Sequence, residues 1–392
     1  MSMFSGDLLS QIINMFMWIF ALGFIFPKLI VYQMMVKLEQ STMKLEVMSK
    51  KAQKTVLEKI SKKPDKKLKD QVKNFMEFFA IPPVDLDPYG IVKKFDHLVK
   101  QEKDRFKYFV DQIAPKSSEE EKANIMMGLS GSMGLYQITK IVRHFLELTK
   151  KTKSQYYAMM LQMQLPLIER IAKSLVHGTE ALSNGWVIGD GIGPYVAVNY
   201  IGSDEVKTDE ENVVSKKKRK GRDIIIIKAK GPGGRTGNPG KILEKLSKKT
   251  EIAKIITIDA AAKLEGEETG SVAEGVGVAM GGIGVERYYI EDVAVKNNIP
   301  IDSIIVKMSQ EEAIMAMKKS IIDAVPRVMK ILDETVARTK EKGTIVIIGV
   351  GNTSGVGNDG KDVKKTGEEI RKIDDEIEKK EKKKKKRFKL PF

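Results

Sequence analysis

The sequence predicts an α/β fold with a mostly parallel sheet and helices on both faces, preceded by a helical region and one amino-terminal transmembrane helix. Three observations support this prediction. After residue 182, short runs of isoleucine and valine alternate with helical patterns. Between residues 37 and 182, apolar residues recur mainly at helical spacing. Near the amino terminus lies a long apolar stretch. The chain of 392 residues has room for about two domains.

The first predicted element is the apolar stretch Leu8–Phe26, in which only Gln11 and Asn14 are strongly polar. A bilayer core of ~30 Å is crossed by about 20 apolar helical residues. Lysines follow this stretch and none precedes it, so the positive-inside rule predicts an amino terminus outside the cell membrane and residues 37–392 in the cytoplasm. A single-pass anchor over residues 1–36 is therefore expected, and a buried soluble helix is the alternative.

The next predicted elements are helical. Residues 37–80 place apolar side chains on one helical face and lysines on the other, which predicts a basic juxtamembrane helix. A solvated coiled-coil stalk would show the same pattern. Pro82 and Pro83 end this segment, and a helical domain is expected over residues 81–182. Its predicted helices are Tyr89–Ile113, Ser118–Lys150 and Ser154–Leu182.

Residues 183–358 show the α/β pattern. The predicted strands are Asp223–Ala229, Lys254–Ile258, Ser303–Lys307 and Thr344–Ile348. The predicted helices between them are Gly240–Lys249, Glu286–Asn297 and Gln310–Lys340. The basic segment Lys207–Arg222 is expected to be a mobile loop. Residues 359–392 are expected to be a disordered basic tail, because Lys379–Lys389 hold nine basic side chains and one acidic one.

Composition excludes several classes of site. Without cysteine there are no disulfides, thiolate zinc sites or cysteine nucleophiles, and three histidines are too few for a histidine-built metal cluster. No metal and no cofactor is therefore expected. The net charge of +16 favours polyanions, so the basic segments are expected to meet anionic lipid or the ribosome. A tail that only improves solubility is the alternative.

Three glycine-rich stretches, at residues 189–194, 231–237 and 349–352, follow predicted strands or open helices. Open α/β sheets bind ligands at this edge, where backbone N–H groups can hold an anion. None matches a nucleotide-binding fingerprint, and tight turns would explain any single one. The candidate binding residues are Gly189, Gly191, Gly193, Gly233, Thr236, Gly237, Gly277, Gly349, Gly351 and Asn352.

Two aspartates are predicted at the same edge. Asp259 ends the strand Lys254–Ile258, and Asp190 lies in a glycine turn that opens a helix. If the sheet brings the two carboxylates together, their repulsion raises one pKa. The protonated one would then be a general acid, and the other would activate water. A helix cap by Asp190 and a buried polar contact by Asp259 would explain both residues without catalysis.

The run from Gly231 to Val306 resembles the spore germination protease family, aspartic-type endopeptidases whose fold is shared with hydrogenase maturation proteases. The matching motifs are Pro232-Gly233, Thr236-Gly237, Ile258-Asp259-Ala260, Thr269-Gly270, Gly275-Val276-Gly277 and Ile299-Pro300. A second family signature is similar to Asn184 followed by Asp190-Gly191-Ile192-Gly193-Pro194. The resemblance covers residues 184–306. It implies a phosphorylase/hydrolase-like fold with Asp190 and Asp259 as the catalytic carboxylates.

The chain departs from this family at two places. Gly189 and Gly191 replace a proline and an alanine of the family's pattern, and helix-like sequence replaces the strand expected before Asn184. The run Ile345–Ile348, followed by Gly349-Val350-Gly351-Asn352, has the form of that missing strand. We therefore expect a circular permutation, in which the last strand fills the position of the family's first strand.

These observations predict a membrane-anchored cytoplasmic hydrolase, an endopeptidase of the aspartic type. The alternative is a non-catalytic, membrane-tethered adaptor that uses the same fold to bind a peptide, a nucleotide or the ribosome. The expected partners are the lipid bilayer through residues 8–36, anionic lipid or the ribosome through the basic segments, a peptide or protein substrate, and a second copy of the chain.

Overall fold

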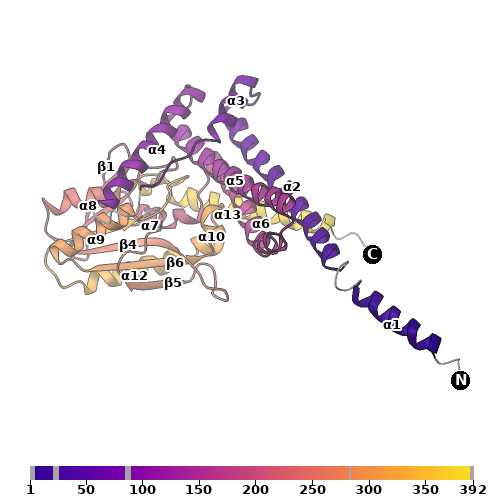
Figure 1. The fold of residues 1–392 in the computed structure, drawn as a ribbon. Helices are drawn as coiled ribbons and strands as arrows, with labels where there is room; N and C mark the ends of the chain where they lie inside the picture. The colour runs from indigo at the N-terminus through magenta and orange to yellow at the C-terminus, as the bar shows by residue number, and fades with distance from the viewer. Residues whose placement is uncertain (1–4, 21–25, 84–89, 282–283, 389–392) are drawn as a thin grey trace. The chain divides into compact units, whose positions relative to one another are not determined.

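The computed structural model describes residues 5–20, 26–83, 90–281 and 284–388 (Figure 1). Two compact units are present, and each is made from two separate segments of the chain. Unit 1 consists of Met1–Lys51 and Gly134–Lys173, and unit 2 consists of Ala52–Met133 and Ser174–Phe392.

Unit 1 is helical. It contains α1 (Ser5–Phe20) and parts of α2 (Phe26–Ile60), α5 (Glu119–Thr152) and α6 (Gln155–Asn184). The amphipathic pattern predicted from Lys37 onward buries Leu38, Thr42 and Leu45 of α2 at helical spacing. The guanidinium of Arg143 on α5 joins this helix through ion pairs to Glu39 and Glu46, at 3.0 and 2.7 Å.

Among the described residues, no helix is both long enough and apolar enough to cross a membrane. Helix α1 has 16 residues, or about 24 Å, against a bilayer core of ~30 Å. Residues 21–25 of the predicted span lie outside the described residues. The predictions of a single-pass anchor over residues 1–36, and of the cell-membrane location and orientation drawn from it, are therefore wrong.

The helical part of unit 2 includes α3 (Lys66–Phe75), α4 (Ile91–Ile113) and the beginning of α5. Helix α5 begins with a capping box: Glu121 N–H donates to the Ser118 hydroxyl, and Ser118 N–H donates to the Glu121 carboxylate. The rings of Phe75 and Phe109 stack with centroids 3.9 Å apart, which packs α3 against α4.

Unit 2 also contains a seven-stranded sheet with the order β1-β2-β3-β7-β4-β6-β5. Its strands are β1 (Val206–Thr208), β2 (Asn212–Arg219), β3 (Arg222–Ala229), β4 (Ile252–Ala262), β5 (Val272–Val276), β6 (Ile301–Met308) and β7 (Thr344–Gly349). The pairs β3–β7, β7–β4 and β4–β6 are parallel, whereas β1–β2, β2–β3 and β5–β6 are antiparallel. The sheet is mixed and the chain is 62% helical, so the predicted fold class is wrong.

The three strands that the sequence did not predict are those at the antiparallel edges. Strand β2 lies in the predicted mobile loop Lys207–Arg222 and pairs with β3 along its full length. Val213 and Ser215 are buried, whereas Lys216 and Lys218 point to solvent. A strand with one polar face has apolar residues at every second position only, and on the polar face of β2 lie lysines. The sequence therefore lacks the continuous apolar run that marks the other strands.

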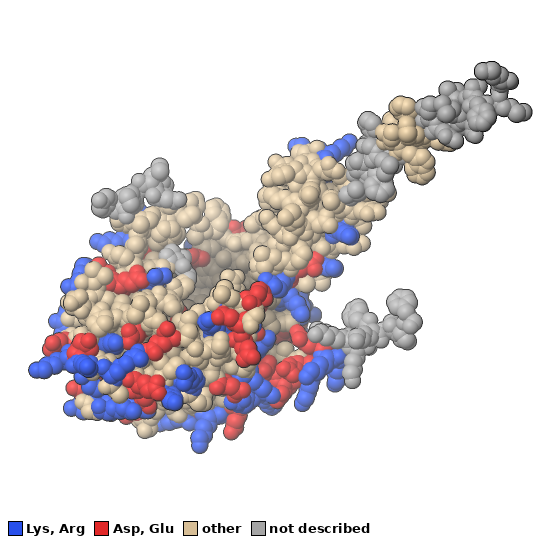
Figure 2. Space-filling model, turned by 90° about the horizontal axis from the view of Figure 1, so that it is seen from below, with Lys and Arg blue, Asp and Glu red and all other residues tan. Residues whose placement is uncertain are grey.

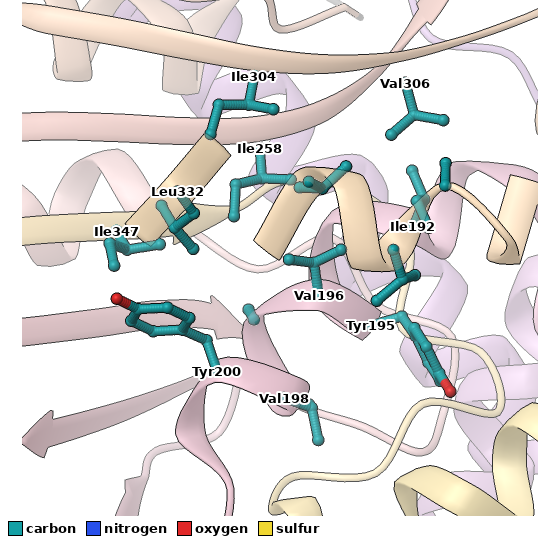
Figure 3. Close-up of a cluster of buried hydrophobic side chains, with 14 of the residues drawn as sticks. Ile192, Tyr195, Val196, Val198, Tyr200, Ile258, Ile304, Val306, Leu332 and Ile347 are labelled. Carbon is teal, nitrogen blue, oxygen red and sulfur yellow. The ribbon is translucent and has the colours of Figure 1, made fainter. Parts of the chain in front are cut away.

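Helices cover both faces of the sheet. One face packs against α7 (Ile192–Ile201) and α12 (Val325–Arg338), where Val196 and Leu332 meet Ile258 and Ile347 (Figure 3). The other face packs against α8 (Pro239–Ser247) and α9 (Val285–Asn297). The predicted helix Gln310–Lys340 is divided into α10 (Gln310–Ile314), α11 (Lys319–Ile322) and α12.

The carboxyl-terminal segment forms a helix, α13 (Val363–Phe388). Ile370 is buried, and the Asp374 carboxylate accepts a hydrogen bond from Lys319 N–H at 2.8 Å. The expectation of a disordered tail over residues 359–392 is therefore wrong for α13, while residues 389–392 lie outside the described residues. On the face shown in Figure 2, basic and acidic side chains are interspersed, so the excess positive charge is spread over that face.

Candidate active site

The candidate site lies where two adjacent parallel strands, β4 and β7, separate. Their last paired residues are Ile258 and Gly349. Strand β4 continues to Ala262 in register with β6, whereas the chain after β7 turns towards the loop that follows β3. There the Thr353 hydroxyl lies 2.8 Å from the carbonyl oxygen of Lys230. Divergent loops at the carboxyl ends of neighbouring strands form the crevice in which open α/β sheets bind ligands.

The two predicted aspartates meet in this crevice. Asp259 directly follows the last residue that pairs with β7 and is only 4% exposed. Its carboxylate accepts a hydrogen bond from Ala260 N–H at 2.7 Å. Asp190 lies in η2 (Gly189–Gly191), a single turn that leads into α7, and its carboxylate accepts from Asn352 N–H at 2.8 Å.

The pKa values of the two carboxylates are set by different surroundings. Burial raises the pKa of Asp259 to about 9, and the negative charge of nearby Asp190 contributes to this rise. Burial also raises the pKa of Asp190, but the hydrogen bond from Asn352 N–H stabilises its ionised form and opposes the rise. At neutral pH, Asp259 therefore holds a proton. The pKa of Asp190 is also raised on balance, but it alone of the two accepts the opposing hydrogen bond from Asn352 N–H.

Both aspartates line one pocket of about 430 Å³. Three predicted binding residues, Thr236, Gly237 and Gly351, line it as well. The apolar part of the wall comes from Met280, Val285 and Val350, and the remaining polar part from the starts of α8 and α9 and one face of α4. The pocket thus joins strand β4, the loops after β3 and β7, and the start of α9, which are far apart in the sequence.

Other predicted glycines support the site without lining it. A Cβ atom at Gly193 would overlap the carbonyl oxygens of Val350 and Ile258, so glycine lets α7 pack directly on the ends of β4 and β7. Gly349 lies opposite, against Gly193, and Gly191 lies against the Asn352 carbonyl. These close contacts fix the turn that carries Asp190.

Three predicted binding glycines lie away from the pocket lining. Gly189 packs against the backbone of Glu312 and Ala313. The Gly233 N–H donates to the Glu120 carboxylate on α5. Gly277 follows the edge strand β5, and no described atom lies within 4 Å of the position of its missing Cβ. Gly189 adjoins Asp190 in the chain, but none of these three glycines lines the pocket of the aspartates.

Sequence reasoning missed three charged residues of the pocket: Asp96 and Lys103 on α4, and Glu286 on α9. The Asp96 carboxylate accepts from Lys241 at 2.6 Å, and the Glu286 carboxylate accepts from Gly240 N–H at 2.7 Å. Burial raises the pKa of Glu286. Asp96 and Lys103 precede the sheet by more than one hundred residues, and no motif marks either of them. Among the residues that the structure describes, no group of three His, Asp or Glu side chains could hold a metal ion.

Comparison with known protein families gives two matches. Residues 12–185 match the amino-terminal domain of DUF1512, described as a protein of unknown function, and residues 188–357 match its carboxyl-terminal domain, also of unknown function. The chain matches both DUF1512 domains, in order. No curated protein and no solved structure matches it. Asp190 and Asp259 both lie in the region that matches the carboxyl-terminal DUF1512 domain.

Proposed function

We propose that this DUF1512-matching protein is a hydrolase of the aspartic type, in which Asp190 and Asp259 act together on a peptide bond. One observation carries the proposal: the buried Asp259 and the partly exposed Asp190 line one pocket, and burial together with the charge of Asp190 raises the pKa of Asp259. Such pairs are favourable for acid–base chemistry, because one group holds a proton while the other is available to accept one.

The hydrogen bonds suggest which aspartate has which role. Asp190, whose charge Asn352 N–H stabilises, takes a proton from water, and the resulting hydroxide oxygen adds to the peptide carbonyl carbon. Asp259 gives its proton to the leaving amide nitrogen when the C–N bond breaks. The products are the free amine and the new carboxyl group, and the aspartate pair again holds one proton, now on Asp190.

The shape of the pocket is compatible with a peptide. Gly237 and Gly351 line it without side chains, which leaves space for a polypeptide backbone beside the aspartates. The resemblance to the spore germination proteases assigns catalysis to the same two aspartates. In the proposed circular permutation, β7 takes the place of that family's first strand, and its position beside β4 supports this arrangement.

The test is cleavage of unfolded polypeptides by the full-length chain from acidic to neutral pH, followed by mass spectrometry of the products. We expect Asp190→Asn and Asp259→Asn each to lower the rate by about a thousandfold or more, because each residue supplies one half of a joint proton transfer. Asp223→Asn, an exposed aspartate on β3, is the matched control and should cleave like the unaltered protein.

The fold of each variant is checked by circular dichroism, so that lost activity is not confused with lost structure. Absence of cleavage by the unaltered protein would contradict the proposal. Cleavage that survives both active-site replacements would contradict it as well. A protein that binds peptides but never cleaves them would instead fit the adaptor alternative.

A further inference from the structure

We infer that the substrate binds as an extended polypeptide of about six residues along one face of α4, with an acidic side chain at the end remote from the aspartates. This inference rests on the proposed function for the position of the cleaved bond. It draws on a second pocket, which the catalytic proposal does not use.

The second pocket has a volume of about 290 Å³ and shares Lys103 with the pocket of the aspartates. Asp96 and Val99 line the first pocket, and Lys107 and Val110 line the second. Together with Lys103, these residues are spaced three or four apart and therefore lie on one helical face. The fourteen helical steps from Asp96 to Val110 rise about 21 Å, the length of about six residues of extended chain.

The opposite wall is also continuous between the two pockets. It is the loop between β3 and α8, which contributes Lys230 and Arg235 to the second pocket and Thr236 to Pro239 to the first. One helix face and one loop thus line both pockets, with the aspartates at one end. A single extended chain that follows these walls would enter both pockets, passing Lys103, which is ion-paired to Glu211.

The charges of the second pocket favour a carboxylate. Most of its cations are already paired: Lys103 with Glu211, Lys122 with Asp111, and Arg235 with Glu120. In the part of the chain that the structure describes, Lys107 and Lys230 have no acidic partner. Two further acidic side chains line this pocket: Glu210, on the turn before β2, and Glu119, which lies 3.2 Å from Lys122. An acidic substrate side chain would face Lys107 and Lys230, the two described lysines of this pocket without an acidic partner.

The experiment measures binding without cleavage, by using the Asp259→Asn variant of the full-length chain. The probes are two fluorescein-labelled peptides of ten residues, identical except that one carries three consecutive glutamates where the other carries glutamines. Fluorescence anisotropy gives the Kd for each peptide. Lys107→Glu and Lys230→Glu are added singly, and Lys364→Glu, an exposed lysine of α13, is the matched control.

We expect the glutamate peptide to bind more tightly than the glutamine peptide. Lys107→Glu and Lys230→Glu should each raise the Kd of the glutamate peptide by about fivefold, because an exposed ion pair contributes up to ~1 kcal/mol. Neither replacement should change the Kd of the glutamine peptide. Lys364→Glu should change neither Kd.

Three results would overturn the inference: neither peptide binds, both peptides bind equally, or Lys107→Glu and Lys230→Glu change the Kd no more than Lys364→Glu does. These outcomes are separate from failure of the proposed function. Suppose that binding depends on charge as expected but the unaltered protein never cleaves the peptide. The peptide-binding surface along α4 would then stand, and catalysis by the aspartates would be wrong.

Discussion

Replacement of Asp259 by asparagine is expected to stabilise the folded protein by about 2–4 kcal/mol at pH 7. The pKa of Asp259 is about 9 in the folded protein, far above the ordinary value of an aspartate, ~3.9. Between these two pH values, the folded state must hold a proton that the unfolded state has lost. This costs about 1.4 kcal/mol for each pH unit above the unfolded pKa. Asparagine is neutral in both states and avoids the cost.

The sign of the pH dependence of this stabilisation follows from the raised pKa. The stabilisation by Asp259→Asn should be absent near pH 4, grow as the pH rises, and level off above pH 9. Urea denaturation of both proteins at several pH values measures it, with Asp223→Asn as the control on an exposed aspartate. A constant difference between the two proteins across this range would show that burial does not raise the pKa of Asp259.

Replacement of Gly193 by alanine is expected to destabilise the protein by about 3 kcal/mol. A Cβ atom at this position would overlap two carbonyl oxygens, those of Val350 and Ile258. Both belong to the backbone at the ends of β7 and β4, where no flexible side chain can move aside. Helix α7 would have to shift away from the sheet and carry Asp190 with it.

The matched control is Gly134→Ala in α5, another helical glycine, with no described atom within 4 Å of the added Cβ. Alanine favours a helix over glycine, so this variant should be as stable as the unaltered protein or more stable by up to ~1 kcal/mol. Urea denaturation at one pH compares the two variants. Equal stabilities would mean that α7 does not need close contact with the strand ends.

The strands predicted correctly from the sequence are those whose own residues identify them as strands. Strands β3, β4, β6 and β7 are runs of β-branched residues buried on both faces, and such runs are recognisable without knowledge of their neighbours. Strand β2 is recognisable only through its pairing with β3, because its outer face is lysine. The charged sequence of α13 likewise reads as disorder, yet contacts with α11 hold it in place.

The residues of the candidate site likewise fall into two groups, those that the local sequence marks and those that only the packing of the chain brings there. Asp190 stands between two glycines and Asp259 follows a run of buried isoleucines, so the chain itself marks them, although β4 continues past Asp259 to Ala262 instead of ending there as predicted. The contribution of α4 is not marked, because Asp96 and Lys103 reach the pocket only through the packing of a distant helix. The apolar stretch that reads as a membrane span fails for another reason. Its first described helix, α1, is too short to cross a bilayer.

The central position of β7 also bears on how the protein is made. Ribosomes deliver β3 and β4 long before Thr344–Gly349, so during synthesis both strands have an unpaired edge where β7 will later lie. Asn352, which fixes Asp190, is delivered later still. A nascent chain therefore cannot assemble the carboxylate pair until nearly the whole domain has been synthesised. If the pair is catalytic as proposed, activity can arise only after β7 has joined the sheet and Asn352 has reached Asp190.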